Sequence, residues 1–200
     1  FMKKVCQDFN IPTAAYEEFD NFEQAKKFIN QSKHPLVIKS DGLAAGKGVT
    51  ISQTIEQSIQ CTKEILEGKF KSSKKVVIEE FLEGEEASYF IITDGENYLP
   101  IGTAQDHKRI GENDTGPNTG GMGAYSPSLL ITKELQEKIN KEIIEPTIIG
   151  LNKIGCSFVG ILYAGLMIKD NQPKLIEYNI RFGDPECQVL MMRIDNDLID

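Results

Sequence analysis

The chain has 200 residues, and its 22 Lys and Arg against 30 Asp and Glu give a formal net charge of −8 at pH 7. Hydrophobic residues make up 40% and charged residues 26%, which is typical of a soluble globular protein of about one or two domains. The acidic balance argues against general nucleic-acid affinity, and no apolar run approaches the roughly 18 residues of a membrane span or resembles a signal peptide. We therefore expect a cytoplasmic protein with no nucleic-acid or membrane partner.

The first third of the chain alternates helical and extended patterns. Phe1, Val5 and Phe9 recur at helical spacing, and the next three residues end that helix. Asp20 with Glu23 resembles a capping box at the start of a second helix. The remaining signals predict a buried strand at 36–38, a strand at 49–51 and a helix that opens at Thr54 with Gln57 and stops at Gly68.

After residue 68 the pattern changes to strands and one long irregular segment. Strands are predicted at 76–78, 87–93 and 98–101. Residues 103–123 contain five glycines and no clear periodicity, and we interpret them as an ordered binding loop, because loops this long in compact domains are usually functional.

The last third again mixes helices and strands. Helical spacing returns and is ended or kinked by Pro146, and strands are predicted at 158–168 and 174–180. Asp184 is predicted to cap a last helix with Pro185 in its first turn. The whole pattern predicts an α+β fold with antiparallel hairpins in its second half.

A glycine-rich segment runs from Lys39 to Gly48 and contains a second lysine, Lys47. Glycines let backbone N–H groups approach a ligand, and two ammonium groups beside them suit phosphates. The segment is not a Walker A loop, because three residues rather than four separate Gly42 from Gly46, and no Ser or Thr follows Lys47. Taken alone, a hairpin lid over phosphates and an ordinary hairpin with solvated lysines have equal weight.

An acidic run at 79–86 leaves a predicted strand and turns at Gly84. The strand can offer backbone groups to a nucleotide base, and Glu86 can accept hydrogen bonds from ribose hydroxyls. In isolation, a solvated acidic turn is the commoner meaning of such a run.

Polar side chains alternate near the end of the strand predicted at 174–180. Glu177, Asn179 and Arg181 are two residues apart and are expected to share one face. A carboxylate and an amide oxygen side by side are hard ligands that suit Mg²⁺, and an arginine can stabilise a phosphoryl group in transfer. A half-exposed amphipathic strand leaves Asn179 unexplained, since asparagine is disfavoured in strands.

The predicted binding loop gathers polar groups of every type at 105–109 and 115–123. Loops of this kind recognise small polar substrates. His107 is flanked by charged residues and is a candidate site residue, but the residues around it do not define its role.

These four segments, in this order, resemble the ATP-grasp superfamily and, more closely, the phosphoribosylamine–glycine ligases of purine biosynthesis. The similarity rests on long motifs: DGLAAGKGV at 41–49, EEFLEGEEAS at 79–88, QDHKR at 105–109, DTGPNTGGMGAYSP at 114–127 and YNIRFGDPE at 178–186. The resemblance implies an ATP-grasp fold of two lobes, residues 1–75 and 76–200, with ATP held between two antiparallel sheets. It also implies that flanking N- and C-terminal domains of a longer enzyme are absent, so that this chain alone is poorly active.

The resemblance implies an ATP-dependent carboxylate–amine ligase. ATP phosphorylates glycine to a glycyl phosphate, and the amine of 5-phosphoribosylamine displaces phosphate to give glycinamide ribonucleotide and ADP. The implied cofactors are ATP and Mg²⁺, with Mn²⁺ as an alternative. Such chemistry needs no covalent nucleophile on the enzyme.

The roles of the family's motif positions carry over residue by residue. Positions that bind ATP match Lys3, Lys39, Gly46, Lys47, Gly48, Glu79, Leu82 and Glu86, and the Mg²⁺ ligands match Glu177 and Asn179. The expected catalytic residues are Arg181, Lys47, Asp106 and His107. The expected substrate-binding residues are Lys108, Arg109, Asn118, Gly120, Gly121, Met122 and Asp184.

One feature departs from the wider superfamily, because strand residues 160–166 include no acidic metal ligand, which leaves the number of Mg²⁺ ions open. Three alternative functions were weighed. Another ATP-grasp ligase, such as a carboxylase subunit, is disfavoured by the segment 105–127. A nucleotide-binding module without catalysis is disfavoured by the retained Glu177, Asn179 and Arg181. A plain α+β interaction domain leaves all four motifs unexplained.

Overall fold

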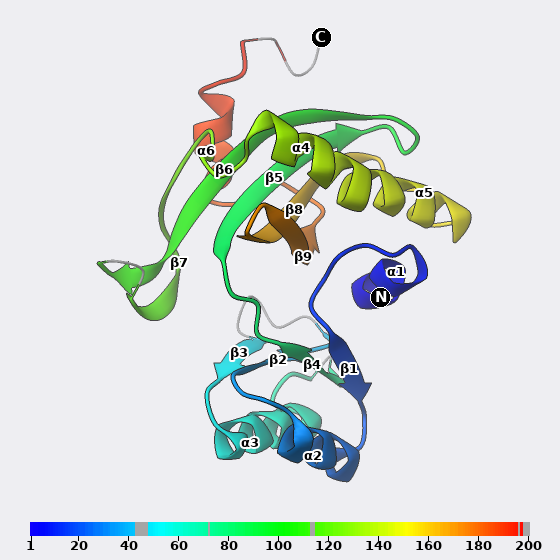
Figure 1. The fold of residues 1–200 in the computed structure, drawn as a ribbon, viewed down its shortest axis with the longest axis vertical. Coiled ribbons are helices and arrows are strands. Elements are labelled where there is room, and N and C mark those ends of the chain that lie inside the picture. Colours follow the sequence, from blue (N-terminus) through cyan, green and yellow to red (C-terminus); the bar gives the residue numbers. More distant parts are fainter. Residues whose placement is uncertain (43–47, 72, 113–114, 196, 198–200) are drawn as a thin grey trace. The chain divides into compact units, whose positions relative to one another are not determined.

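The computed structural model describes residues 1–42, 48–71, 73–112, 115–195 and 197. The chain divides into two compact units (Figure 1), which are described separately. The small unit is Ala14–Leu82, and the large unit combines Phe1–Thr13 with Glu83–Asp200. These units differ from the lobes 1–75 and 76–200 of the sequence analysis. The boundary moves because β4 (Val76–Glu80) pairs with two strands of the small unit, while the first residues of the chain belong to the large one.

The small unit is an antiparallel four-stranded sheet whose one face is covered by two helices (Figure 1). The strand order is β1 (Tyr16–Phe19), β4, β2 (Leu36–Ser40) and β3 (Val49–Ser52), and the helices are α2 (Phe22–Gln31) and α3 (Ile55–Leu66). Their core is built from Ala25, Ile29, Leu36, Ile38, Ile65, Val76 and Ile78.

The two helices of the small unit begin at side-chain caps. Thr54 accepts a hydrogen bond from the Gln57 backbone N–H at 3.2 Å, so the predicted start of α3 is confirmed. The predicted capping box of α2 is wrong by one residue: the cap is Asn21, whose Oδ1 accepts from the backbone N–H of Gln24 at 3.1 Å.

The large unit is an antiparallel five-stranded sheet with helices on both faces (Figure 1). The strand order is β7 (Thr115–Tyr125), β6 (Tyr98–Gly111), β5 (Glu85–Thr93), β8 (Gly160–Lys169) and β9 (Gln172–Asn179). The main core lies between this sheet and the helices α1 (Met2–Asp8), α4 (Lys133–Ile139), the π-helix η1 (Asn140–Ile144) and α5 (Glu145–Lys153). On the other face, α6 (Glu186–Met191) packs against β6 and closes a smaller core of Phe90, Ala104, Tyr163 and Leu190.

The helix that contains Pro146 continues instead of ending there. Pro146 has no N–H to donate and occupies the first turn of α5, and the five residues before that helix form the π-helix η1. The widened turn accommodates the missing hydrogen bond, so α4, η1 and α5 follow one another along the sheet. Of the two predicted effects of Pro146, an end or a kink of the helix, the end is therefore wrong.

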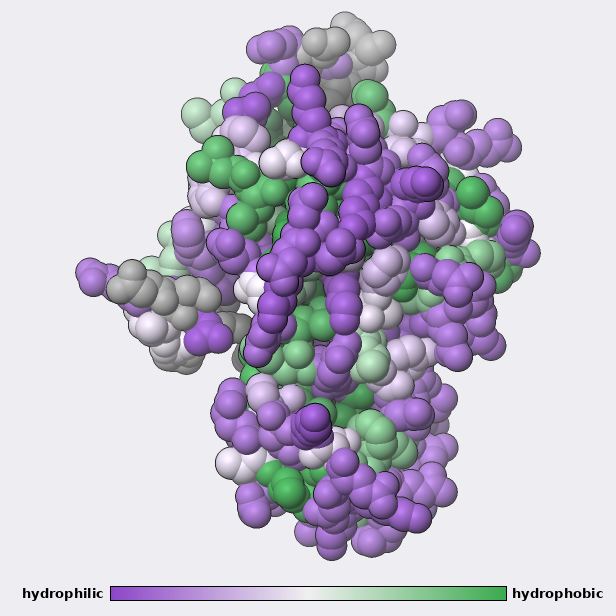
Figure 2. All heavy atoms as spheres, in the orientation of Figure 1, coloured by the Kyte–Doolittle hydropathy of each residue, from purple (hydrophilic) through white to green (hydrophobic). Residues whose placement is uncertain are grey.

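Figure 2 shows hydrophilic residues over most of the face in view, with hydrophobic residues in small separate groups. Among the described residues, no helix has both the length and the apolar character needed to cross a bilayer.

The segment 103–123, predicted as a loop, is mostly strand. It belongs to a long antiparallel hairpin of β6 and β7, in which Gln105 faces Tyr125 and Arg109 faces Asn118. The glycine-rich composition hid the strands, because glycines and irregular register remove the alternation by which strands are recognised. This hairpin nevertheless carries the polar residues that the sequence singled out.

The turn between β5 and β6 is held by Asp94. Its Oδ1 accepts hydrogen bonds from the backbone N–H groups of Asn97 at 2.6 Å and Glu96 at 2.8 Å, which lower its pKa to about 2. Gly95 has φ +97°, and a Cβ there would lie 2.6 Å from Ser157 Oγ, so only glycine fits. This turn joins the strands that the sequence predicted at 87–93 and 98–101.

We expect Asp94→Ala to lower the melting temperature near neutral pH, because two backbone N–H groups lose their acceptor. The pKa of Asp94 is lower in the folded than in the unfolded state. The ionised Asp94 therefore stabilises the fold fully above its ordinary pKa of 3.8, and this stabilisation is lost as the pH falls through about 2. Calorimetric unfolding should show that the difference in melting temperature between the variant and wild type shrinks as the pH falls from 3.8 to about 2. Glu96→Ala is the control, and an equal loss in that variant would contradict the role of Asp94.

Candidate functional site

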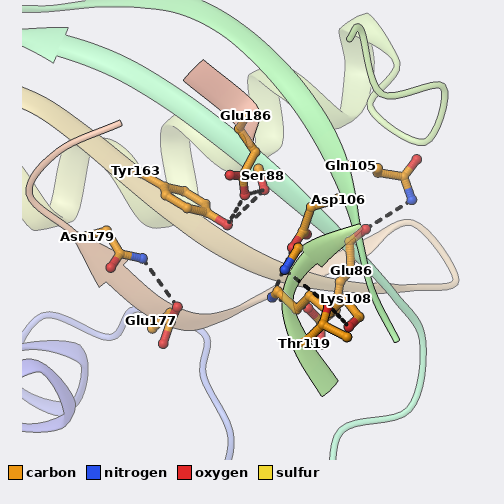
Figure 3. Close-up of polar contacts among 11 residues, drawn as sticks. Glu86, Ser88, Gln105, Asp106, Lys108, Thr119, Tyr163, Glu177, Asn179 and Glu186 are labelled. Atoms are coloured by element: carbon orange, nitrogen blue, oxygen red, sulfur yellow. Dashed lines mark hydrogen bonds and ion pairs between the residues drawn. The ribbon is translucent and has the colours of Figure 1, made fainter. Parts of the chain in front are cut away.

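One face of the large sheet carries a row of polar side chains beside the core that α6 closes (Figure 3). Successive residues of a strand point to opposite faces, so Ala87 and Tyr89 of β5 enter the main core while Glu86 and Ser88 point to the other side. Asp106 and Lys108 of β6 lie beside Glu86. The polar row is therefore contributed by the central strands of the sheet.

The proposed metal pair, Glu177 and Asn179, reaches this face through a bulge in β9. The register shifts so that Gly165 of β8 faces Glu177 while Leu166 faces Leu175, and Ile176 is therefore the extra residue of the bulge. Leu175 and Tyr178 can then both pack in the main core. Glu177 and Asn179 point the other way, and Gly165 leaves room beside Glu177, since a Cβ would lie 3.3 Å from its Cγ.

The side chains of Glu177 and Asn179 lie together, as the sequence predicted. Asn179 Nδ2 donates a hydrogen bond to Glu177 Oε1 at 3.2 Å (Figure 3). Glu177 is exposed and Asn179 is half-buried, so a carboxylate and an amide oxygen are accessible to an ion. Within the described parts of the chain, no group of three or more His, Cys, Asp or Glu could hold a metal. The carboxylate and amide oxygens are hard donors that fit Mg²⁺, an ion that uses few protein ligands and completes its shell with phosphate and water.

Arg181 does not share the strand face of Glu177 and Asn179. Strand β9 ends at Asn179, so the two-residue alternation does not extend to Arg181. Arg181 is exposed, and its Nη1 donates a hydrogen bond to the backbone oxygen of Phe182 at 2.7 Å. The predicted shared face is thus wrong for Arg181, although the residue remains two positions from Asn179. The predicted helix start also shifts, because Pro185 rather than Asp184 is the N-cap of α6.

Lys108 bridges two carboxylates of the polar row. Its Nζ lies 2.9 Å from Glu86 Oε2 and 3.7 Å from Asp106 Oδ2 (Figure 3). The Asp106 side chain is only 9% exposed, and its burial raises its pKa; Lys108 opposes this shift, and the charges of Glu186 and Glu86 add to it. The neighbouring carboxylates raise the pKa of Lys108 against the effect of its burial. Lys108 is therefore a fixed cation between two carboxylates.

We expect Asp106→Asn to raise the melting temperature near neutral pH. The pKa of Asp106 is higher in the folded state, so ionisation weakens the fold as the pH rises from 3.8 through the folded pKa. The higher melting temperature of the Asp106→Asn variant should therefore disappear below pH 3.8, the ordinary pKa of the aspartate. Calorimetric unfolding at several pH values tests this, with the exposed Asp8→Asn as the control. A lower melting temperature for Asp106→Asn at neutral pH would refute it.

The residues 119–122 bulge out of β7. In the ladder with β6, His107 faces Gly123 and Arg109 faces Asn118, so these four residues stand opposite Lys108 alone. Thr119 Oγ1 donates to the Lys108 backbone oxygen at 2.8 Å and accepts from the Gly121 N–H at 3.1 Å.

The bulge brings predicted substrate residues together. A Cβ on Gly121 would lie 2.8 Å from Pro185 Cδ and 3.6 Å from the Asp184 backbone oxygen, so glycine is needed for this approach. Gly120 and Met122, in the same bulge, are exposed. The structure thus places Gly121 against Asp184 and Pro185, which precede α6.

His107 does not join Asp106 and Lys108. It lies between them on β6, is exposed, and has its ring centroid 6.0 Å from that of Tyr125. Neighbouring residues of a strand point to opposite faces, so His107 is directed away from the polar row. Arg109 is half-buried, and Asn118 faces it in the ladder.

In the small unit, Lys39 and Glu79 form an ion pair. Lys39 Nζ lies 3.1 Å from Glu79 Oε1, and the two side chains are 17% and 5% exposed. The pair forms because β2 and β4 are neighbours, with Val37 facing Glu79 and Lys39 facing Val77. Leu82 is half-buried at the end of the unit.

Four other residues are expected to contact ATP, and they differ in their surroundings. Gly48 is buried, and its oxygen accepts from the Ser40 N–H at 2.9 Å. Gly46 and Lys47 lie outside the described residues. Lys3 is buried in the large unit, where its Nζ donates to Thr13 Oγ1 at 2.8 Å, and Thr13 Oγ1 donates to the Leu175 oxygen at 2.6 Å.

The structure adds a group that the sequence analysis missed, formed by Glu186, Tyr163 and Ser88. Glu186 is 3% exposed, and its Oε1 accepts a hydrogen bond from the Tyr163 hydroxyl at 3.0 Å (Figure 3). Ser88 Oγ lies 2.9 Å from Tyr163 Oη and 3.4 Å from the same carboxylate oxygen. The available signal was weak, because Ser88 and Tyr163 are hydroxyl-bearing residues within two largely apolar strands.

Comparison with known proteins assigns the family. Residues 1–187 match the sequence model of the phosphoribosylglycinamide synthetase ATP-grasp (A) domain. The chain belongs to this family. It is 57% identical to the chloroplastic phosphoribosylamine–glycine ligase of Arabidopsis thaliana over 99% of this chain and 38% of the relative. It is 56% identical to the phosphoribosylamine–glycine ligase of Brucella melitensis over all of this chain and 47% of the relative.

Solved structures agree with the family. The phosphoribosylamine–glycine ligase of Thermotoga maritima superposes with a TM-score of 0.88 at 36% identity, over 96% of this chain and 49% of that one. A biotin carboxylase domain from Hydrogenobacter thermophilus, solved with MgADP, has a TM-score of 0.75 at 18% identity over 99% of this chain and 42% of that one, and it supports the fold alone. The predicted α+β, ATP-grasp fold is therefore confirmed. The chain spans less than half the length of the relatives it matches.

Proposed function

We propose that this chain is the ATP-binding core of a phosphoribosylamine–glycine ligase of purine biosynthesis. The observation that carries the proposal is the accessible Glu177–Asn179 pair beside the polar row of Glu86, Lys108 and Asp106, on one sheet face of a chain from this family. The reaction joins glycine to 5-phosphoribosylamine through a glycyl phosphate and releases ADP and phosphate. The flanking domains of such a ligase would complete the site for the amine.

We assign the residues expected to contact ATP within each unit by itself. In the small unit, Lys39 supplies a cation for phosphate, and Glu79 and the backbone of Leu82 accompany the adenine; Lys47, Gly46 and Gly48 complete the phosphate loop. In the large unit, Glu86 accepts from the ribose hydroxyls and Lys3 adds a cation. Glu86 is paired with Lys108, so ribose would compete with that ammonium for the carboxylate.

Glu177 and Asn179 would hold Mg²⁺, for which Mn²⁺ could substitute. The ion would supply positive charge against the phosphate oxygens during transfer. Arg181 would then act on the same charge from the segment after β9, because a guanidinium can bind two phosphate oxygens at once. These roles use only charge and position, which suit phosphoryl transfer.

The other groups of the large unit are assigned to the two substrates. Asp106 and Lys108 would orient the small substrate beside Glu177, with His107 and Arg109 from the same strand. The bulge residues Gly120, Gly121 and Met122, with Asn118 and Asp184, would bind the glycine or the ribosyl phosphate. We also infer a cytoplasmic location and no nucleic-acid or membrane partner.

The test is ADP release by the protein as its gene encodes it, with ATP, Mg²⁺, glycine and 5-phosphoribosylamine. We expect release to require all four components and to yield glycinamide ribonucleotide, identified by mass spectrometry. ADP release that is independent of glycine, or that depends on a different carboxylate, would refute the proposed substrates.

A further inference from the structure

We propose that Glu186, acting with Tyr163 and Ser88, is a positioning residue for the segment 180–185, which carries Arg181. The inference rests on the proposed function, because the segment matters through its place beside the phosphoryl-transfer site. These three hydrogen-bonded residues form the Glu186 network.

The Glu186 network connects α6 to two adjacent inner strands of the large sheet, β5 and β8. Glu186 is the first residue of α6, while Ser88 belongs to β5 and Tyr163 to β8. All three residues are buried, with exposures of 3%, 1% and 6%. A buried carboxylate is costly unless it is hydrogen-bonded, so the contacts of 3.0 and 3.4 Å to Glu186 Oε1 define where this carboxylate can lie.

Tyr163 is suited to act as a permanent donor to Glu186. Burial raises the pKa of its hydroxyl, and the charge of Glu186 adds to the increase. The phenol therefore stays protonated across the neutral range and can donate to the carboxylate. The hydroxyl of Ser88, directed at Tyr163 Oη, extends the same chain of groups into β5.

The segment before α6 rests on the Glu186 carboxylate. A Cβ on Gly183 would lie 2.2 Å from Glu186 Oε2, so the backbone of the segment approaches the carboxylate as closely as only glycine allows. The Cys187 N–H donates to the Gly183 oxygen at 3.0 Å, and the Phe182 ring lies 6.2 Å from the Phe90 ring. The carboxylate thus fills the space beneath the segment.

The supported segment joins three parts of the proposed site. It leaves β9 directly after Asn179, and Arg181 donates to the oxygen of Phe182, the residue next to Gly183. At its other end, Asp184 and Pro185 lie against Gly121 of the bulge in β7. Glu186 therefore acts on the reaction through Arg181 and Gly121, and the distance from Asn179 to Arg181 depends on a backbone that this carboxylate holds.

The test uses Tyr163→Phe and Glu186→Gln in the full-length protein, with Tyr89→Phe as the matched control. Tyr89 is a buried tyrosine on the opposite face of the same sheet, where its hydroxyl donates to Asn140 Oδ1 at 2.8 Å. We expect Tyr163→Phe to lower kcat by about tenfold to a hundredfold, the effect of a small misplacement of a reacting group, with the Kd for Mg·ATP nearly unchanged. Glu186→Gln should lose less, because its amide oxygen still accepts from Tyr163.

Hydrogen exchange of the backbone amides at 180–187 gives a second readout. We expect faster exchange there in Tyr163→Phe and Glu186→Gln, and wild-type exchange and kcat in Tyr89→Phe even if its melting temperature falls. Equal kcat and equal exchange in the two tyrosine variants would overturn the proposal, as would a change confined to the KM values. If wild type shows no glycine-dependent turnover, the proposed function fails, and exchange at 180–187 still tests the positioning by itself. If Glu186→Gln does not fold, Tyr163→Phe decides.

Discussion

Replacing Glu177 with alanine is expected to abolish Mg²⁺-dependent ATP binding. Of the two proposed Mg²⁺ ligands, Glu177 supplies the carboxylate. In the variant, Asn179 would offer only a neutral oxygen, and its Nδ2 would lose the acceptor Glu177 Oε1, which lies 3.2 Å away. Loss of a group that merely supports a metal ligand already costs about tenfold to a hundredfold in affinity, so loss of the ligand itself should cost at least about a hundredfold.

Calorimetry with ATP, in the presence and absence of Mg²⁺, measures this effect. The exposed Glu96→Ala, which removes a surface carboxylate from the same unit, serves as the control and should bind Mg·ATP like wild type. The fold should be unaffected in both variants, because Glu177 is exposed. An unchanged Mg²⁺ dependence in Glu177→Ala would remove this residue from the set of metal ligands.

The ion pair of Lys39 and Glu79 provides the second large effect. Lys39→Met would leave the Glu79 side chain, 5% exposed, without its 3.1 Å cation partner, and loss of one member of a buried pair costs about 3–5 kcal/mol in the free energy of unfolding. ATP affinity should fall as well, because Lys39 is a proposed phosphate contact.

A double-mutant cycle separates the structural role of Lys39 from its role in binding. We expect the double variant Lys39→Met with Glu79→Met to regain much of the lost stability, since a buried pair can be replaced by apolar side chains of similar volume. It should not regain ATP affinity, because no cation has been restored. Recovery of both properties would exclude Lys39 as an ATP ligand, and purely additive losses of stability would show that the pair is not coupled.

Local patterns predicted elements that contain an apolar run or begin at a side-chain cap. Val76-Val77-Ile78 lies in β4, and Thr54 with Gln57 begins α3. The hairpin of β6 and β7 could not be predicted in this way, because its bulges and glycines break the alternation and its pairing is fixed by long-range contacts. Local rules also place the end of a helix at Pro146. The π-helix η1 accommodates the proline instead, and the helix continues into α5.

The candidate site was predictable to the extent that it depends on spacing within one strand. Glu177 and Asn179 are two residues apart and lie together, whereas Arg181 falls beyond the end of β9. His107 sits in a charged run yet faces away from it, because the strand alternates. The contacts of Glu186 could not be predicted from the sequence, because its partners come from two other elements, β5 and β8, which only the tertiary fold brings together.

The most direct test of the proposed ligase chemistry follows one oxygen atom. Glycine labelled with oxygen-18 in its carboxylate is supplied with ATP, Mg²⁺ and 5-phosphoribosylamine, and the inorganic phosphate is analysed by mass spectrometry. If the carboxylate attacks the γ-phosphate and the amine then displaces phosphate, the bridging oxygen leaves with the phosphorus. Each phosphate released should therefore carry one oxygen-18 atom from glycine, whereas unlabelled phosphate formed together with glycinamide ribonucleotide would contradict a glycyl phosphate.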